Sequence, residues 1–313
     1  VEALRFTTDG LQPETLTRLS LGVIANVEAT VNGTGRIAWS GADVTSTGRF
    51  AVDAPALAAP FGPVTGVRTE LVFTDLLGLV TAPDQRLSVA TINPGIQVGD
   101  GDVRYRLVPG MRIALDSARW PLAGGTLTLR PATLDFAADA ARALTFDIAG
   151  LDAARFINQL ELANVNATGI FDGTLPMVFD KDGGRIVGGR LAARGPGTLS
   201  YVGEVSNANL GIWGGIAFDA LKSMAYRDLT IALDGRIDGE MVSEIRFAGV
   251  SRGTIQPVAT GLIAQLGGRL ASRLQQLPFQ FNIRVSAPFR GLMATSRSLS
   301  DPSLLIQDRL GPG

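Results

Sequence analysis

The sequence predicts an all-β protein built on one elongated antiparallel sheet, and three observations lead to that prediction. Apolar and polar residues alternate with a period of two in many segments, which is typical of strands with one dry and one wet face. Glycine-rich turn pairs separate these segments, and such short connections join antiparallel neighbours. Only three segments carry a helical pattern. Together these features favour a long meander, extended strand by strand.

The alternating segments define the apolar faces of the expected strands. In chain order these faces carry Val23, Val27 and Val31; then Val165, Ala167, Phe171, Leu175, Met177 and Phe179; then Leu229, Ile231 and Leu233; then Met241, Ile245 and Phe247; and finally Phe279, Phe281, Ile283 and Val285. Small residues interrupt the second face at Ala167, Gly169 and Gly173. Such gaps could accommodate a mobile apolar ligand, although glycine in a strand more often marks a bend or a bulge.

Turn pairs are expected between the strands. They are Asn32-Gly33, Asp100-Gly101, Pro109-Gly110, Gly124-Gly125, Asp182-Gly183-Gly184 and Asp238-Gly239.

The three helical segments span residues 151–160, 218–224 and 257–276. The first follows a start signal at Asp152, and the last begins with Pro257 and repeats apolar residues at helical spacing. We expect this longer amphipathic helix to cap one end of the sheet, because open strand edges invite aggregation. Contact with a membrane surface is the alternative. Residues 1–295 are predicted to form a single domain, with a polar, loosely ordered tail at 296–313.

Composition excludes several classes of function. The formal charge of −1 argues against a nucleic-acid partner, whose phosphates require clustered lysine and arginine. The chain has no cysteine and no histidine, which removes the usual nucleophile, general base and metal ligands. We therefore expect no catalytic residues, no metal and no cofactor. No apolar run is long enough to span a bilayer. Because the chain opens at Val1 without a signal segment, we expect its targeting information to lie upstream.

Two acidic pairs and three tryptophans are further candidate sites. Asp100 with Asp102, and Asp180 with Asp182, loosely resemble calcium loops but lack the further ligands, so tight turns explain them better. The tryptophans, at positions 39, 120 and 213, are too scattered to form a sugar platform, and we expect each to be buried.

Several segments resemble one known family. Residues 120–127, Trp-Pro-Leu-Ala-Gly-Gly-Thr-Leu, are similar to a recurring element of the YdbH family of bacterial intermembrane lipid-transport proteins. The run from Gly197 to Gly249 and the closing segments 278–283 and 287–291 are also similar to that family. The likeness covers most of the chain from about Asn93 onward. These are motifs of a fold and not of a catalytic site.

The resemblance implies a fold and a function that composition does not. YdbH proteins belong with the AsmA-like group, which includes TamB, and their sheets curl into a U-shaped trough (a β-taco) with an apolar interior. The family implies an N-terminal anchor in the inner membrane, absent from this chain, and a path across the periplasm of a Gram-negative bacterium. The implied ligand is phospholipid, carried toward the outer membrane with a small outer-membrane lipoprotein at the C-terminal end.

On this resemblance, the residues that would line a lipid groove are those of the later apolar faces. They are Val165, Ala167, Phe171, Leu175, Met177, Phe179, Leu229, Ile231, Leu233, Met241, Ile245, Phe247, Phe279, Phe281, Ile283 and Val285.

Three other interpretations stay open at this point. Alternation alone is more typical of a β-sandwich whose inner faces form an ordinary core than of a lipid groove. The sheet could instead be an interaction module that pairs strands with an envelope partner and binds no lipid. A hydrolase that uses only carboxylates would need two of them about 5–10 Å apart in a cleft, and the sequence does not show such a pair.

Overall fold

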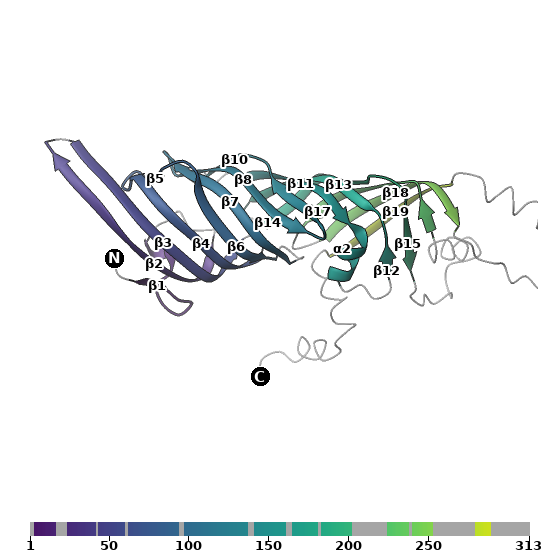
Figure 1. Ribbon diagram of the computed structural model, residues 1–313, viewed down its shortest axis with the longest axis horizontal. Coiled ribbons are helices and arrows are strands. Elements are labelled where there is room, and N and C mark those ends of the chain that lie inside the picture. The colour runs from purple at the N-terminus through teal and green to yellow at the C-terminus, as the bar shows by residue number, and fades with distance from the viewer. Residues whose placement is uncertain are drawn as a thin grey trace, which may run out of the picture.

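The structure is a computed structural model that describes residues 3–16, 24–41, 43–59, 62–93, 97–136, 141–160, 165–180, 183–201, 224–237, 240–252 and 279–288. Its strands follow one another along the length of an elongated molecule (Figure 1). The predicted helix at 257–276 and the tail at 296–313 lie outside the described residues. So does the predicted helix at 218–224 except for Met224, which belongs to a strand.

Nineteen strands and two short helices make up the described residues. In the first half they are β1 (Leu4–Phe6), α1 (Pro13–Leu16), β2 (Ala25–Ser40), β3 (Asp43–Ala59), β4 (Gly62–Asp75), β5 (Val80–Thr81), β6 (Gln85–Ile92), β7 (Val98–Val108), β8 (Arg112–Leu122), β9 (Gly125–Leu129) and β10 (Ala132–Asp135). In the second half they are β11 (Arg142–Asp152), α2 (Ala153–Gln159), β12 (Val165–Ala167), β13 (Ile170–Asp180), β14 (Gly183–Ala193), β15 (Gly197–Tyr201), β16 (Met224–Tyr226), β17 (Asp228–Arg236), β18 (Glu240–Arg252) and β19 (Phe279–Pro288).

The strands form one long antiparallel sheet that does not close into a barrel. Its main ladder runs β1, β2, β3, β4, β6, β7, β8, β9, β11, β13, β14, β17, β18 and β19. The short strands β5 and β10 extend this ladder beside β4 and β8. Among the described residues, β1 pairs only with β2, and β19 pairs only with β18. The predicted all-β, antiparallel fold is confirmed.

A bend crosses the later strands and curls the sheet. A short break separates β12 from β13, β14 from β15, and β16 from β17. β18 has no such break, and it pairs with β17 on one side of the bend and with β16 on the other. At the first break Gly169 has φ +121°, a conformation that other residues rarely adopt. The hydroxyl of Tyr226 donates a hydrogen bond to the carbonyl of Thr168 at 2.6 Å and lies over this glycine. The bend is therefore specified by a glycine and fixed by a tyrosine.

The one described helix of more than a single turn begins where the sequence indicates. The Asp152 carboxylate accepts a hydrogen bond from the backbone N–H of Arg155 at 3.1 Å and caps α2. Ala153 is buried, and α2 packs beside β11 and β12 at the margin of the sheet. The predicted helix at 151–160 is confirmed, with slightly narrower bounds.

The predicted turns are partly right. Pro109-Gly110 joins β7 to β8, Gly124-Gly125 joins β8 to β9, and Gly183 begins the return strand β14. Asp182 and the pair at 238–239 lie outside the described residues. Two turn predictions are wrong, because Asn32-Gly33 lies within β2 and Asp100-Gly101 lies within β7.

The surroundings of both residue pairs explain why they lie within strands. At Gly33 the ring of Phe50 from β3 occupies the place where a β-carbon would be, so the glycine makes room for an aromatic side chain. Asp100 has φ +52° and produces a local irregularity in β7, a signal that a bulge shares with a turn. Next to it, the Trp120 indole from β8 lies directly over Gly101.

We expect Gly101→Ala to destabilise the protein by about 1–3 kcal/mol, because the new methyl group would overlap the Trp120 indole and force the ring or the strand to move. Chemical unfolding monitored by circular dichroism measures the change. Gly99→Ala in the same strand is the matched control, since its nearest new neighbour would be the Ala90 carbonyl oxygen at an ordinary 3.4 Å. Equal stability changes in the two variants would contradict the packing of Trp120 on Gly101.

Candidate functional site

One face of the sheet carries a continuous row of apolar residues and glycines. Residues that pair directly across neighbouring strands lie on the same face, so the strand register defines the row. It is called the central row here and runs Ala54, Val67, Val89, Gly101, Trp120, Leu127, Ile148, Gly173, Leu191, Ile231, Ile245 and, by backbone register alone, Ile283.

A second row lies beside the first on the same face. This second row runs Leu4, Val31, Val52, Thr69, Leu87, Val103, Ala118, Leu129, Phe146 and Leu175. Thr69 is its only polar member, and its hydroxyl is hydrogen-bonded to the hydroxyl of Tyr105 at 2.9 Å. Together the two rows form one apolar face from β1 to β18.

Burial changes along this face. In the central row the members from Ala54 to Ile148 are buried except for half-buried Leu127, whereas Leu191, Ile231 and Ile245 are all half-buried. Most aliphatic members of the second row are also half-buried and pack against the same cluster of buried side chains. The apolar side chains of the later strands are therefore less buried than those of the earlier strands, although they pack against the same cluster of buried residues.

The opposite face is charged and matched across the strands. The residue next in sequence to each member of the central row points to this opposite face. The strand register pairs these residues in the order Asp53, Arg68, Ser88, Asp102, Arg119, Thr128, Asp147, Thr174 and Arg190. Arg68 pairs with Asp53 at 3.5 Å, and Arg130 forks onto Asp147 at 2.7 Å. A hollow of about 560 Å³ lies over β2 to β7 and is lined by Asp53, Arg68, Glu70 and Arg86 of this charged face, and also by Val52, Thr69 and Leu87 of the second row.

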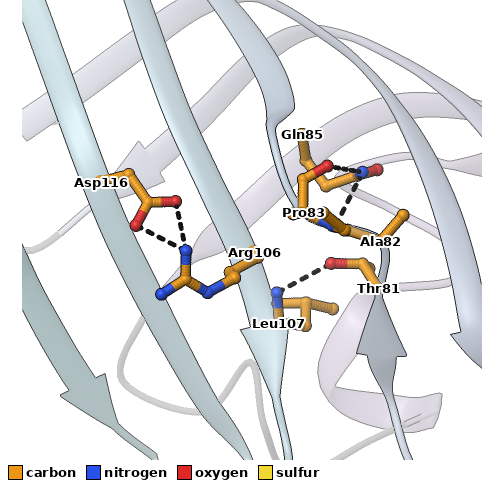
Figure 2. A network of polar contacts seen from close by, with 7 residues as sticks. All are labelled: Thr81, Ala82, Pro83, Gln85, Arg106, Leu107 and Asp116. Atoms are coloured by element: carbon orange, nitrogen blue, oxygen red, sulfur yellow. Dashed lines mark hydrogen bonds and ion pairs between the residues drawn. The ribbon is translucent and has the colours of Figure 1, made fainter.

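Polar groups at one margin of the sheet are fully engaged. The Gln85 amide donates to the carbonyls of Ala82 at 3.0 Å and Pro83 at 3.2 Å (Figure 2). Its oxygen accepts a hydrogen bond from the Val72 N–H. The Thr81 hydroxyl accepts from the N–H of Leu107 at 2.9 Å. Figure 2 also shows Arg106 on Asp116, a half-exposed ion pair. These bonds satisfy the irregular backbone where the sheet ends between β4 and β6.

The structure places most of the sequence-predicted groove residues together on the apolar face. Buried or half-buried within its packed clusters are Ala167, Phe171, Leu175, Met177, Phe179, Leu229, Ile231, Leu233, Met241, Ile245 and Phe247. Val165 is half-buried in β12. Phe279, Phe281, Ile283 and Val285 lie in β19, whose backbone register is described and whose side chains are not.

The gaps that the sequence indicated on this face are filled. Tyr226 covers Gly169, and Leu191 lies over Gly173. Both glycines accommodate neighbouring side chains and leave no empty channel at those two positions.

Sequence reasoning found only a small part of the first half of the apolar face: Val27 is buried and Val31 lies in the second row, whereas Val23 lies outside the described residues. Val52, Val67, Val89, Trp120 and Phe146 were not predicted as members of a site, although the structure aligns them with Ile231 and its neighbours. A signal existed in the alternation of Leu87 with Val89 and of Val103 with Tyr105, which lie two residues apart on one face.

The tryptophans differ from one another. Trp120 is buried and packs 6.2 Å from the ring of Phe146, as predicted. Trp39 is 71% exposed, so the prediction that it is buried is wrong. Trp39 is the last residue of β2 on the apolar side of the strand, in the part of the β2–β3 hairpin that extends beyond the sheet. Trp213 lies outside the described residues.

The described residues hold no group of three or more acidic side chains placed to bind a metal ion. Asp180 pairs with Arg185 at 2.5 Å, and Asp102 faces Arg119 across β7 and β8. Asp100 lies in a strand irregularity, and not in the tight turn that the sequence predicted. Among all the residues that the structure describes, no helix is both long and apolar enough to cross a membrane.

Two aspartates on the charged face titrate abnormally. Hydrogen bonds from Arg130 hold the pKa of Asp147 below its usual value of 3.8, and the Thr174 hydroxyl adds a further bond at 2.9 Å. Hydrogen bonds from Arg194 likewise lower the pKa of Asp172, which also accepts from the Gly150 N–H at 2.8 Å. A lowered folded-state pKa means that each carboxylate stabilises the fold above about pH 4 and loses that contribution as the pH falls through its folded pKa.

We expect Asp147→Asn to reduce stability at neutral pH by no more than about 1 kcal/mol, because the ion pair is largely exposed. The difference from the unaltered protein should narrow toward about pH 2, because Asp147 becomes protonated in the folded protein only below its usual pKa and asparagine carries no charge at any pH. Urea unfolding at the two pH values measures it. A difference that stays constant with pH would mean that the charge on Asp147 does not stabilise the fold.

The geometry defines an elongated, open, antiparallel-sheet protein with one continuous apolar face and one ion-paired face. The sequence model of the YdbH-like family, described as intermembrane phospholipid transport protein YdbH, matches residues 1–311. This chain belongs to that family, and with it to the lipid-transport proteins of the cell envelope. No curated protein and no solved structure matches the chain.

Proposed function

We propose that the apolar face shields the acyl chains of phospholipids while they pass between the inner and outer membranes. The observation that carries this proposal is the pair of apolar rows, aligned by strand register from β1 to β18 and only partly buried over the later strands. The family's phospholipid transport supplies the ligand class.

The energetics favour such a surface. Each methylene removed from water contributes roughly 0.8 kcal/mol, so an acyl chain of about 16 carbons resists entering water by roughly 13 kcal/mol. An apolar row that continues from strand to strand lowers this barrier along its whole length. The chemistry needed is contact alone, which agrees with side chains such as Leu191, Ile231 and Ile245 and requires no catalytic group, metal or cofactor.

The wider setting is part of the proposal. We place the protein in the periplasm of a Gram-negative bacterium, held at the inner membrane by an anchor that precedes this chain. Residues 1–295 act as one trough, with the segment at 257–276 closing an end, and residues 296–313 form its tail. In this arrangement the phospholipid headgroups stay at the open side of the trough, in water.

The free edge of β19 favours a protein partner as well. β19 pairs with β18 over the backbone from Phe279 to Pro288, and no described strand pairs with its other side. Strand addition to such an edge is a common recognition mode. A small outer-membrane lipoprotein at this end is the partner we propose. The alternative function, a module that pairs strands and binds no lipid, rests on the same edge.

Native mass spectrometry and lipid extraction of protein purified without detergent test the proposal. We expect bound phospholipid, together with uptake of a fluorescent phospholipid from vesicles of phosphatidylethanolamine and phosphatidylglycerol. Protein free of lipid that also takes up none would leave the interaction module as the better account.

A further inference from the structure

The hairpin of β2 and β3 extends well beyond the rest of the sheet. β3 leaves its ladder with β4 at Gly48, which pairs with Phe73, and β2 pairs with β1 only up to Val31. Among the described residues, the two strands from Arg36 to Thr47 form a ladder only with each other, although the Ser46 carbonyl also accepts a hydrogen bond from the Leu76 N–H at 3.2 Å. Figure 1 shows this hairpin projecting at the N-terminal end of the molecule. Beyond its base, a two-stranded ribbon has no second layer to cover either of its faces.

One face of the projecting ribbon continues the second row. From Val31 opposite Val52, the same face carries Gly33 with Phe50, Gly35 with Gly48, Ile37 with Ser46, and Trp39 with Val44. The opposite face carries Arg36, Ala38, Ser40, Asp43, Thr45 and Thr47. The ribbon therefore has one apolar and one polar face, and they lie on the same sides as the apolar and charged faces of the sheet.

The apolar side of the tip is open to solvent. Trp39 is 71% exposed, Val44 49% and Ile37 38%. Leaving three large apolar side chains in water opposes folding, because each would gain free energy on burial. Their clustering on one face of a ribbon points to a ligand or partner that covers that face.

The base of the ribbon is held in a defined position. The Ser46 hydroxyl donates to the carboxylate of Asp75 at 2.7 Å and accepts from the N–H of Leu77 at 2.9 Å. The Leu76 side chain covers the glycine pair Gly35 and Gly48. Below it the rings of Phe50 and Phe73 meet edge to face at 5.9 Å. These contacts fix the direction in which the apolar face of the tip points.

We infer that the β2–β3 ribbon is a raised wall of the lipid path, on which Ile37, Trp39 and Val44 contact the acyl chains of a phospholipid bound to the apolar face; this rests on the proposed function. Two observations favour acyl chains as the occupant. The residues of this face continue the register of the second row, and none of them from Val31 to Trp39 is charged. The Asp75 carboxylate that meets the face is bonded to Ser46, and Leu76 lies over Gly35 and Gly48. A strand added to either edge of the ribbon would pair with its backbone and leave side chains that stand perpendicular to it uncovered.

Photo-crosslinking from single positions tests this inference. A benzophenone amino acid is introduced at position 39, at position 38 on the opposite face of the same strand, and at position 231 on the central row. Each full-length chain is loaded from vesicles of phosphatidylethanolamine and phosphatidylglycerol that carry a radiolabelled acyl chain, and is then illuminated. We expect labelling at positions 39 and 231 to exceed that at position 38 several-fold.

The outcomes separate the two proposals. Labelling at 231 with no excess at 39 over 38 overturns the role of the ribbon and leaves the proposed function standing. Absence of labelling at all three positions overturns both. A protein adduct formed at 39 in cell envelopes, without lipid labelling there, overturns the assignment of acyl chains and identifies a protein as the occupant.

Discussion

Replacing Phe247 with alanine is expected to lower the free energy of unfolding by about 3–5 kcal/mol. Phe247 is only 2% exposed and is the largest side chain that is fully buried among the described residues. It lies 6.3 Å from the ring of Tyr226 and opposite Leu229, where the bend in the sheet brings β16, β17 and β18 together. Its removal would leave a cavity at the bend, which the surrounding strands could close only in part.

Urea or guanidinium unfolding at neutral pH measures this loss. Arg246→Ala is the matched control, because Arg246 is the preceding residue in β18, points to the charged face and pairs with Glu244 only at the surface. We expect the control to change stability by less than about 1 kcal/mol. Similar losses in the two variants would show that the apolar face is not packed at the bend.

The second large effect concerns ligand binding. Ile231→Asp is expected to reduce the phospholipid that copurifies with the protein by about tenfold or more, since a carboxylate on the apolar face must lose its water when acyl chains lie over it. Ile231 is half-buried and belongs to the central row, where it lies between Leu191 and Ile245. Its partial exposure leaves the new charge access to water in the lipid-free protein, so the fold should survive.

Ala232→Asp provides the comparison for the second effect. Ala232 is the next residue of β17, faces the charged side and pairs across the strands with Arg190 and Glu244. We expect it to retain phospholipid at the unaltered level. Circular dichroism and thermal unfolding establish that both variants are folded. If Ile231→Asp unfolds, Ile231→Ser supplies the measurement, and undiminished lipid in a folded variant at position 231 would contradict a role for this face.

Local features of the fold could be predicted from the sequence. The alternation of Leu229, Ile231 and Leu233 with polar neighbours indicated a strand with two different faces, and the structure has β17 there. Asp152 indicated the start of α2 because its short side chain can accept a hydrogen bond from the first turn of a helix, and it does so in the structure. Both signals lie within a few residues of the feature they specify.

Features that depend on distant strands could not be predicted. Gly33 and Gly101 look like turn residues until the rings of Phe50 and Trp120, from neighbouring strands, are placed over them. The exposure of Trp39 depends on where β4 stops pairing with β3, which the sequence of the hairpin does not contain. The central row likewise exists only once the register of each strand pair is fixed.

The most direct test of the central claim uses single-cysteine variants along β17, at positions 230, 231, 232 and 233, in a chain that has no cysteine of its own. Each variant carries a bimane label, and phospholipids brominated on the acyl chain are added to quench it. Side chains alternate between the two faces of a strand, so we expect strong quenching at 231 and 233 and weak quenching at 230 and 232. Quenching that is absent, or equal at all four positions, would contradict an acyl-chain path on the apolar face.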